Sequence, residues 1–186
     1  MITCPACQAP LQENSPACPS PNCQLSLERV DRALGPVPQI SPGLSDTVSL
    51  LSSKKKKSIN AAIHAFERDL SPYYLHVVIR NFDPKYNLSL QLFWLFNKAG
   101  LSPVEHKLAD NYDLMLGLDP VGNRLGLMIG YGLEPFISKE TISTLLEEAA
   151  PSLEKNNPEE AILTALKSLR TLLQTASNSA KTTLGL

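Results

Sequence analysis

The spacing of hydrophobic residues changes between helical and strand-like several times in the larger, C-terminal part of the chain. Apolar side chains recur every three or four residues from Ser53 to Leu70, which predicts an amphipathic helix. The stretch Tyr73–Phe82 is rich in Tyr, Val and Ile and predicts a strand. Residues Leu88–Ala99 are apolar almost all round, so we expect a deeply buried helix that Asn87 caps.

Two strands and two further helices are predicted after this buried helix. Leu114–Leu118 and Arg124–Tyr131 read as strands, and the Asp-Pro-Val-Gly-Asn stretch between them predicts the turn of a hairpin. Ser138 is a suitable cap for one helix and Asn157 for the last one. Helices before and after a small set of strands predict an α/β fold, an α-β-α sandwich with a small mixed sheet.

The chain of 186 residues is long enough for one ordinary core and one small module. We divide it into a ribbon at 1–31, a Pro/Gly linker at 32–43, an α/β domain at 44–176 and a flexible tail at 177–186. The formal net charge of -1 gives no overall attraction for nucleic acid or anionic lipid. Without an N-terminal apolar run or a long apolar stretch, we expect a cytoplasmic protein that does not enter membranes.

All four cysteines of the chain lie near its start, at Cys4, Cys7, Cys18 and Cys23. Two residues separate the first pair and four separate the second, a spacing typical of structural zinc sites in which four thiolates complete a tetrahedron. Because cytosolic thiols are kept reduced, we predict structural Zn(II) rather than disulfides. A disulfide pair and a redox-active thiol pair are the alternatives.

The predicted zinc ribbon carries very little charge. Residues 1–28 contain no Lys or Arg, and Glu13 and Glu28 are their only charged side chains. Zinc bound to four thiolates would add about two negative charges. Because affinity for nucleic acid depends on neutralising phosphates, we do not expect this ribbon to bind it. A contact with a protein or a role in stapling the chain together fits better.

Several stretches of the α/β domain resemble the TPM domain, a family named for thylakoid phosphatase-like, photosystem repair and receptor-regulating proteins. The most specific stretch has the sequence Ile-Gly-Tyr-Gly-Leu-Glu. The matching residues are Leu44–Asp46, Leu50–Ser52, Asp110–Asp113, Leu114–Leu118 and Ile129–Glu134. The chain departs from the family pattern at Tyr112 and Pro135, where relatives commonly have glycine. Most relatives carry a signal peptide and a membrane helix, so their location and partners are not transferred to this chain.

The resemblance implies that acidic residues cluster at an edge of the sheet. Members of the family are reported to bind calcium, and phosphatase activity has been proposed for some of them. Carboxylates that converge in this way are hard ligands suited to Ca(II) or Mg(II). Otherwise they cap turns and the starts of helices. The candidates are Asp46, Asp110, Asp113 and Glu134.

Three functions are compatible with these patterns. We expect a zinc-binding cytosolic protein whose TPM-like domain acts as a protein-binding or scaffold module for a partner that the sequence does not identify. The alternatives are a metal-dependent phosphatase that uses the acidic cluster and a nucleic-acid-associated zinc-ribbon protein. Catalysis is the weaker reading, because the α/β domain has no cysteine nucleophile and no phosphate-binding loop ending in Gly-Lys-Ser/Thr.

Overall fold

The computed structural model describes an α/β protein with one sheet. The described residues are 4, 6–7, 9–10, 17–23, 25–101, 112–134 and 136–184. Their strands are β1 (Leu44–Asp46), β2 (Tyr74–Ile79), β3 (Asp113–Asp119) and β4 (Arg124–Ile129). Their helices are α1 (Leu27–Leu34), α2 (Ser53–Asp69), α3 (Leu88–Lys98), α4 (Lys139–Glu154) and α5 (Pro158–Leu184).

The sheet is mixed and its strands follow the order of the chain, β1-β2-β3-β4. The first three strands are parallel, and β4 runs antiparallel to β3. The carboxyl ends of β1, β2 and β3 therefore meet at one end of the sheet, at Asp46, Ile79 and Asp119. We call this the carboxyl end of the sheet, and the opposite end, where β4 finishes beside Asp113, the amino end.

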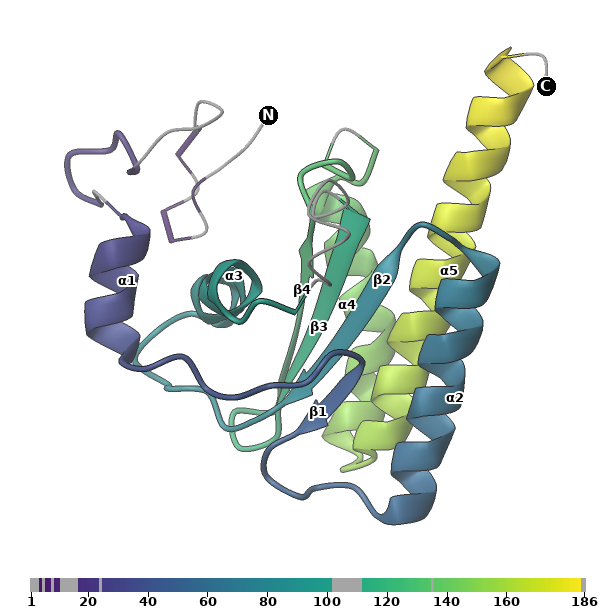
Figure 1. The fold of residues 1–186 in the computed structure, drawn as a ribbon, viewed down its shortest axis with the longest axis horizontal. Helices are drawn as coiled ribbons and strands as arrows, with labels where there is room; N and C mark the ends of the chain where they lie inside the picture. The colour runs from purple at the N-terminus through teal and green to yellow at the C-terminus, as the bar shows by residue number, and fades with distance from the viewer. Residues whose placement is uncertain are drawn as a thin grey trace.

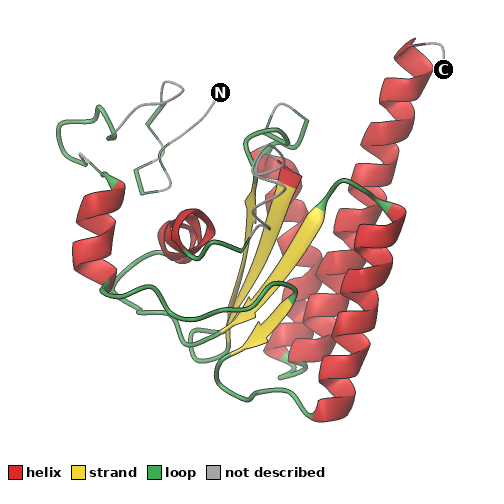
Figure 2. Cartoon of the chain, in the orientation of Figure 1, coloured by secondary structure: helices red, strands yellow, loops and turns green. Residues whose placement is uncertain are grey.

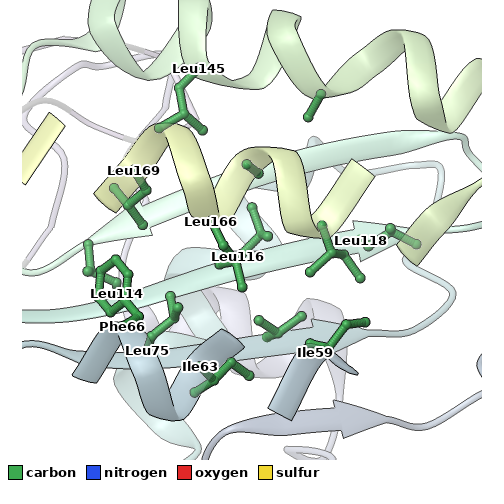
Figure 3. Close-up of a cluster of buried hydrophobic side chains, with 14 of the residues drawn as sticks. Ile59, Ile63, Phe66, Leu75, Leu114, Leu116, Leu118, Leu145, Leu166 and Leu169 are labelled. Atoms are coloured by element: carbon green, nitrogen blue, oxygen red, sulfur yellow. The ribbon is translucent and has the colours of Figure 1, made fainter. Parts of the chain in front are cut away.

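Helices cover both faces of the sheet, which confirms the predicted α-β-α sandwich. One face carries α2, α4 and α5, while α3 lies on the other and α1 packs against α3 (Figures 1 and 2). Side chains of β3 alternate between the two layers: Leu114 and Leu116 pack toward α2 and α5 (Figure 3), whereas Met115 joins the core around α3. Every residue of β3 is buried, as expected for a strand covered on both faces.

A pair of glycines brings α3 close to the sheet. Gly117 of β3 lies opposite Gly126 of β4, and the side chain of Leu92 fills the space that both lack. A Cβ atom at Gly117 would lie 2.3 Å from one methyl carbon of Leu92, and a Cβ atom at Gly126 would lie 2.7 Å from the other. The glycines therefore allow an apolar helix to pack directly on the strands.

The caps predicted for the helices are confirmed. The side chain of Asn87 accepts a hydrogen bond from the backbone N–H of Leu90 at the start of α3. Ser138 does the same for Thr141 at the start of α4. The hairpin of β3 and β4 also forms where its turn residues placed it.

Two boundaries differ from the sequence prediction. Helix α1 crosses the expected border at residue 31 between ribbon and linker, so the extended connector starts only at Gly35. Helix α5 continues through Leu184 and so includes most of the range 177–186, where we expected a flexible tail. Its last turns contain Ala, Ser, Thr and Lys without an internal Gly or Pro to end the helix. In the part of the chain described here, no helix is both long enough and apolar enough to cross a bilayer.

Candidate metal centre

The four cysteines converge on one point, with ligand atoms that all lie within 4.8 Å of one another. The Sγ atoms of Cys4 and Cys23 are 3.7 Å apart, and those of Cys7 and Cys18 are 3.5 Å apart. A tetrahedral zinc ion with Zn–S bonds of about 2.3 Å requires sulfur atoms about 3.8 Å apart. All four are free thiols. The set therefore has the number, chemistry and spacing to hold one metal ion.

Backbone hydrogen bonds fix the two turns that present these thiols. The N–H of Cys4 donates to the carbonyl of Ala9 over 2.8 Å, which closes the first turn. The N–H of Cys23 donates to the carbonyl of Ser20 over 3.0 Å and closes the second turn. A bond of 2.7 Å from the N–H of Cys18 to the carbonyl of Leu25 links the second turn to the segment that starts α1.

The thiols differ in their readiness to lose a proton. A backbone hydrogen bond at Ala9 lowers the pKa of Cys7 to about 7, whereas burial raises the pKa of Cys23 to about 12. Burial also raises the pKa of Cys18. Metals bind thiolates, so an ion entering this site must displace protons from the buried thiols. A metal ion held by all four cysteines would have no open position for a substrate, an arrangement typical of structural sites.

Helix α1 connects the cysteine cluster to α3. The carboxylate of Asp31 accepts a 2.8 Å hydrogen bond from Nε1 of Trp94 and one of 2.7 Å from Nζ of Lys98. These contacts, with Lys98 the largest contributor, lower the pKa of Asp31 below its usual range. Val30 is 2% exposed and joins the core around α3, against which Leu25 also packs. The N-terminal module is thus attached to the α/β domain by both polar and apolar contacts.

The structure places Asp46 away from the other acidic candidates. Asp46 pairs with Ile79 at the carboxyl end of the sheet, whereas Asp113 pairs with Tyr74 at the amino end. Tyr74 and Ile79 are the two ends of β2, five residue steps apart, a distance of about 17 Å along a strand. The expected convergence of all four carboxylates is therefore wrong for Asp46. The order and direction of the strands determine where Asp46 lies, and hydrophobic periodicity does not predict either of them.

Asp46 instead caps the turn that leads into α2. Its two carboxylate oxygens accept hydrogen bonds of 3.0 Å from the N–H groups of Leu50 and Leu51, and Nζ of Lys56 lies 3.1 Å away. Burial raises the pKa of Asp46, but these three partners together bring it below the usual value. The alternative interpretation, that the carboxylates cap turns, describes this residue.

Two of the remaining acidic candidates lie toward the amino end of the sheet, and the third is outside the described residues. Asp113 is 4% exposed, and Glu134 is half-buried in the turn after β4, where burial raises its pKa. Asp110 lies outside the described residues. Within those residues, only the cysteines form a group of three or more side chains that could hold a metal ion. A Ca(II) or Mg(II) site therefore stays a prediction without a described ligand set.

Buried polar residues at the carboxyl end of the sheet organise the loops there. Asp119 is 1% exposed, and its Oδ2 accepts hydrogen bonds of 2.9 Å and 2.6 Å from Nε and Nη2 of Arg124. The pair braces the hairpin of β3 and β4, because Asp119 ends one strand and Arg124 begins the other. Sequence analysis missed Gln91, which holds the loop after β2, and Arg80, the first residue of that loop. A glutamine within an otherwise apolar helix and an arginine directly after an apolar strand were the available signals.

Comparisons with known proteins agree with this fold. A TPM domain model matches residues 44–172. The chain is similar in structure to the N-terminal domain of a P. gingivalis protein, at 19% identity over 71% of this chain and 82% of that chain, with a TM-score of 0.50. It is also similar to the BA42 protein of Bizionia argentinensis, at 11% identity over 70% and 86%, with a TM-score of 0.56. The N-terminal domain of cg2496 from Corynebacterium glutamicum matches at 17% identity over 70% and 78%, with a TM-score of 0.52. No curated protein sequence matches the chain.

Proposed function

The chain belongs to the TPM domain family, and on that premise we propose that it is a zinc-stabilised binding module for a protein partner rather than an enzyme. The metal would be structural Zn(II) at Cys4, Cys7, Cys18 and Cys23, because four thiolates favour this ion and leave no open coordination position. A reducing compartment such as the cytosol suits a site that needs free thiols.

The observation that carries the proposal is an exposed pair of aromatic residues at the amino end of the sheet. Tyr131 is 49% exposed and Phe136 is 70% exposed, in the turn that follows β4. Large aromatic side chains are over-represented among the residues that dominate the energy of protein interfaces. An exposed phenylalanine two residues after a half-buried Glu134 therefore supports a contact surface for a protein.

A phosphatase finds less support. Asp46 is occupied by two backbone N–H groups and Lys56, at the opposite end of the sheet from Glu134. These two carboxylates are too far apart to share a metal ion. We expect no hydrolysis of a chromogenic phosphate ester by the full chain, with or without added Mg(II) or Ca(II). Turnover that is lost on Glu134→Gln would favour the enzyme instead.

The contact surface can be tested by affinity capture from native lysate with matched variants. Phe136→Ser removes an exposed aromatic group at the amino end, whereas Val121→Ser removes a residue that is 77% exposed in the hairpin turn at the carboxyl end. We expect one set of proteins to be enriched by the wild type and by Val121→Ser, and lost with Phe136→Ser. A set that Phe136→Ser retains unchanged would place the contact elsewhere, and no enrichment by any form would remove the support for a binding module.

A further inference from the structure

A cavity of about 260 Å³ lies between α1, α3 and the loop that follows β2. It is at the carboxyl end of the sheet, the position where open α/β sheets most often bind ligands. Polar and aromatic side chains from the loop and from α3 line it, together with the last residues of α1. Its main lining residues are Leu34, Arg80, Asn81, Asp83, Gln91 and Trp94.

Arg80 is the cationic residue in the lining of this cavity, and its guanidinium lies against the ring of Phe82. Its side chain is half-buried, and its central carbon lies 5.4 Å from the centre of the Phe82 ring. Among the described residues, no carboxylate forms an ion pair with Arg80 and no side chain accepts a hydrogen bond from it. Burial lowers the pKa of Arg80, as expected for a cation that is removed from water without a counter-charge.

The loop that carries Arg80 is held in place before any ligand arrives. Oδ1 of Asp119 accepts a hydrogen bond of 3.4 Å from the N–H of Phe82. The side chain of Gln91, which is 5% exposed, accepts from the N–H of Asp83 and donates to its carbonyl, each over 2.9 Å. Asp119 and Gln91, both buried, thus hold this loop in one conformation. Binding a ligand then costs less entropy, because the loop is already ordered.

We infer that this cavity binds a small anionic ligand whose phosphate or carboxylate group pairs with Arg80. The planar guanidinium offers two parallel N–H donors that match either group. The carboxyl end of α1, at Leu34, and the side chain of Asp83 add negative charge to the lining, so the attraction for an anion comes from direct pairing with the Arg80 guanidinium. The volume lies below the roughly 300–1,000 Å³ of sites for drug-sized ligands, which favours a small anion over a nucleotide. This inference does not depend on the proposed protein-binding surface.

Asp83 gives the inference a second consequence. Asp83 lines the same cavity, and its Oδ1 accepts a hydrogen bond from the N–H of Lys85, two residues along the loop. A negative charge at this place weakens the binding of an anion. Replacing Asp83 with Asn should therefore raise the affinity for an anion. If Arg80 has only a structural role and binds no anion, this replacement should leave the affinity unchanged.

The test is a titration of the full chain with inorganic phosphate and, separately, with succinate, followed by tryptophan fluorescence. Trp94 is the only tryptophan of the chain and lines the cavity, so it reports directly on occupancy. We expect a saturable change with at least one probe, weakened about tenfold or more by Arg80→Gln and strengthened by Asp83→Asn. Arg68→Gln, on the exposed side of α2, removes the same charge from the other face of the sheet and should bind as the wild type does.

Each outcome of this titration decides the inference. A response to phosphate alone or to succinate alone identifies which group the cavity selects. Should Arg80→Gln lose its native circular dichroism, Arg80→Lys keeps the charge, loses the planar fork, and should bind several times more weakly than the wild type. The absence of a saturable response to both probes, or equal affinity in wild type, Arg80→Gln and Arg80→Lys, would overturn the inference.

Discussion

At the residue scale, buried polar side chains at the carboxyl end of the sheet determine how the loops are held. Asp119 is 1% exposed and has Arg124 as its charged partner, 2.6 Å away at the closest. A carboxylate this deep is tolerated only when its oxygens are satisfied. Asp119 also accepts from the N–H of Phe82, so the same group supports the hairpin and the loop after β2.

Loss of the Arg124 guanidinium should therefore be costly. We expect Arg124→Met to lower the free energy of unfolding by about 2–3 kcal/mol, because it leaves the Asp119 carboxylate buried without its counter-charge. Urea unfolding followed by circular dichroism measures this. Arg68→Met breaks the exposed pair with Asp69 and serves as the control, with stability close to wild type. An equally small effect of Arg124→Met would show that Asp119 does not depend on this partner.

The stability of the chain should also depend on pH through His76. This residue is 3% exposed, its Nδ1 accepts a hydrogen bond from the N–H of Gly43, and burial lowers its pKa to about 4. The unfolded chain takes up a proton near pH 6.5, whereas the folded chain resists until pH 4. A lowered histidine pKa contributes stability that is present above pH 6.5 and is lost as the pH falls toward 4.

We expect the free energy of unfolding to fall between about pH 6.5 and pH 4 in the wild type, and to fall less in His76→Gln. Urea unfolding at several pH values measures this free energy for both proteins. The difference between them at each pH gives the contribution of His76, because the carboxylates are the same in both. His64→Gln replaces an exposed histidine of α2 and should follow the wild type. Parallel pH curves for the wild type and His76→Gln would contradict the assignment.

At the scale of elements, α3 is the link between the cysteine cluster and the sheet. One side of it packs on the strands through Leu92, and the other side meets α1 through Trp94 and Lys98. This explains why the helix is apolar almost all round, as the sequence indicated. A helix with two covered sides is a rigid support for the module that precedes it.

Removing the Asp31 carboxylate should loosen the contact between α1 and α3 while the four metal ligands themselves stay in place. We expect Asp31→Asn to shift the fluorescence of Trp94 and to make α1 more accessible to hydrogen exchange, because the pair with Lys98 is lost. Zinc content should remain unchanged, since the cysteines are separate from this contact. Arg32→Gln, which breaks the exposed pair with Glu28 on the same helix, is the matched control. Unchanged exchange in Asp31→Asn would show that apolar packing alone holds α1.

The elements that could be predicted are those whose signals are local. Caps such as Asn87 and Ser138 and the apolar spacing of long helices are written within a few neighbouring residues. β1 could not be predicted from local signals, because its three residues form a strand only by pairing with β2. α1 has apolar residues three and four apart at Leu27, Val30 and Leu34, but the Gly and Pro residues that follow obscured this short pattern. The placement of Asp46 depends on strand order, a non-local property.

At the scale of the whole molecule, two hydrophobic cores lie on opposite faces of the sheet, and only one of them contains residues of the N-terminal module. The larger core lies between the sheet and α2, α4 and α5, and the residues described there include none of the N-terminal module. The smaller core around α3 includes Val30 and has Ala6, Leu25 and Leu34 packed against it. Metal binding at the cysteines should therefore be coupled to the α3 side of the molecule and only weakly to the other side.

Removal of the metal tests this coupling. We expect about one zinc per chain in the purified protein, and we expect a strong chelator to release it with a change in Trp94 fluorescence, because the cysteine turns lose the ion that joins them. The far-ultraviolet circular dichroism should change little, since most helical residues belong to α2, α4 and α5. Cys4→Ser should show the fluorescence of the chelated protein from the start and respond little to chelator. Zinc release that leaves Trp94 unaffected would mean that the module and α3 are independent, and a zinc content far below one per chain would exclude zinc as the resident metal.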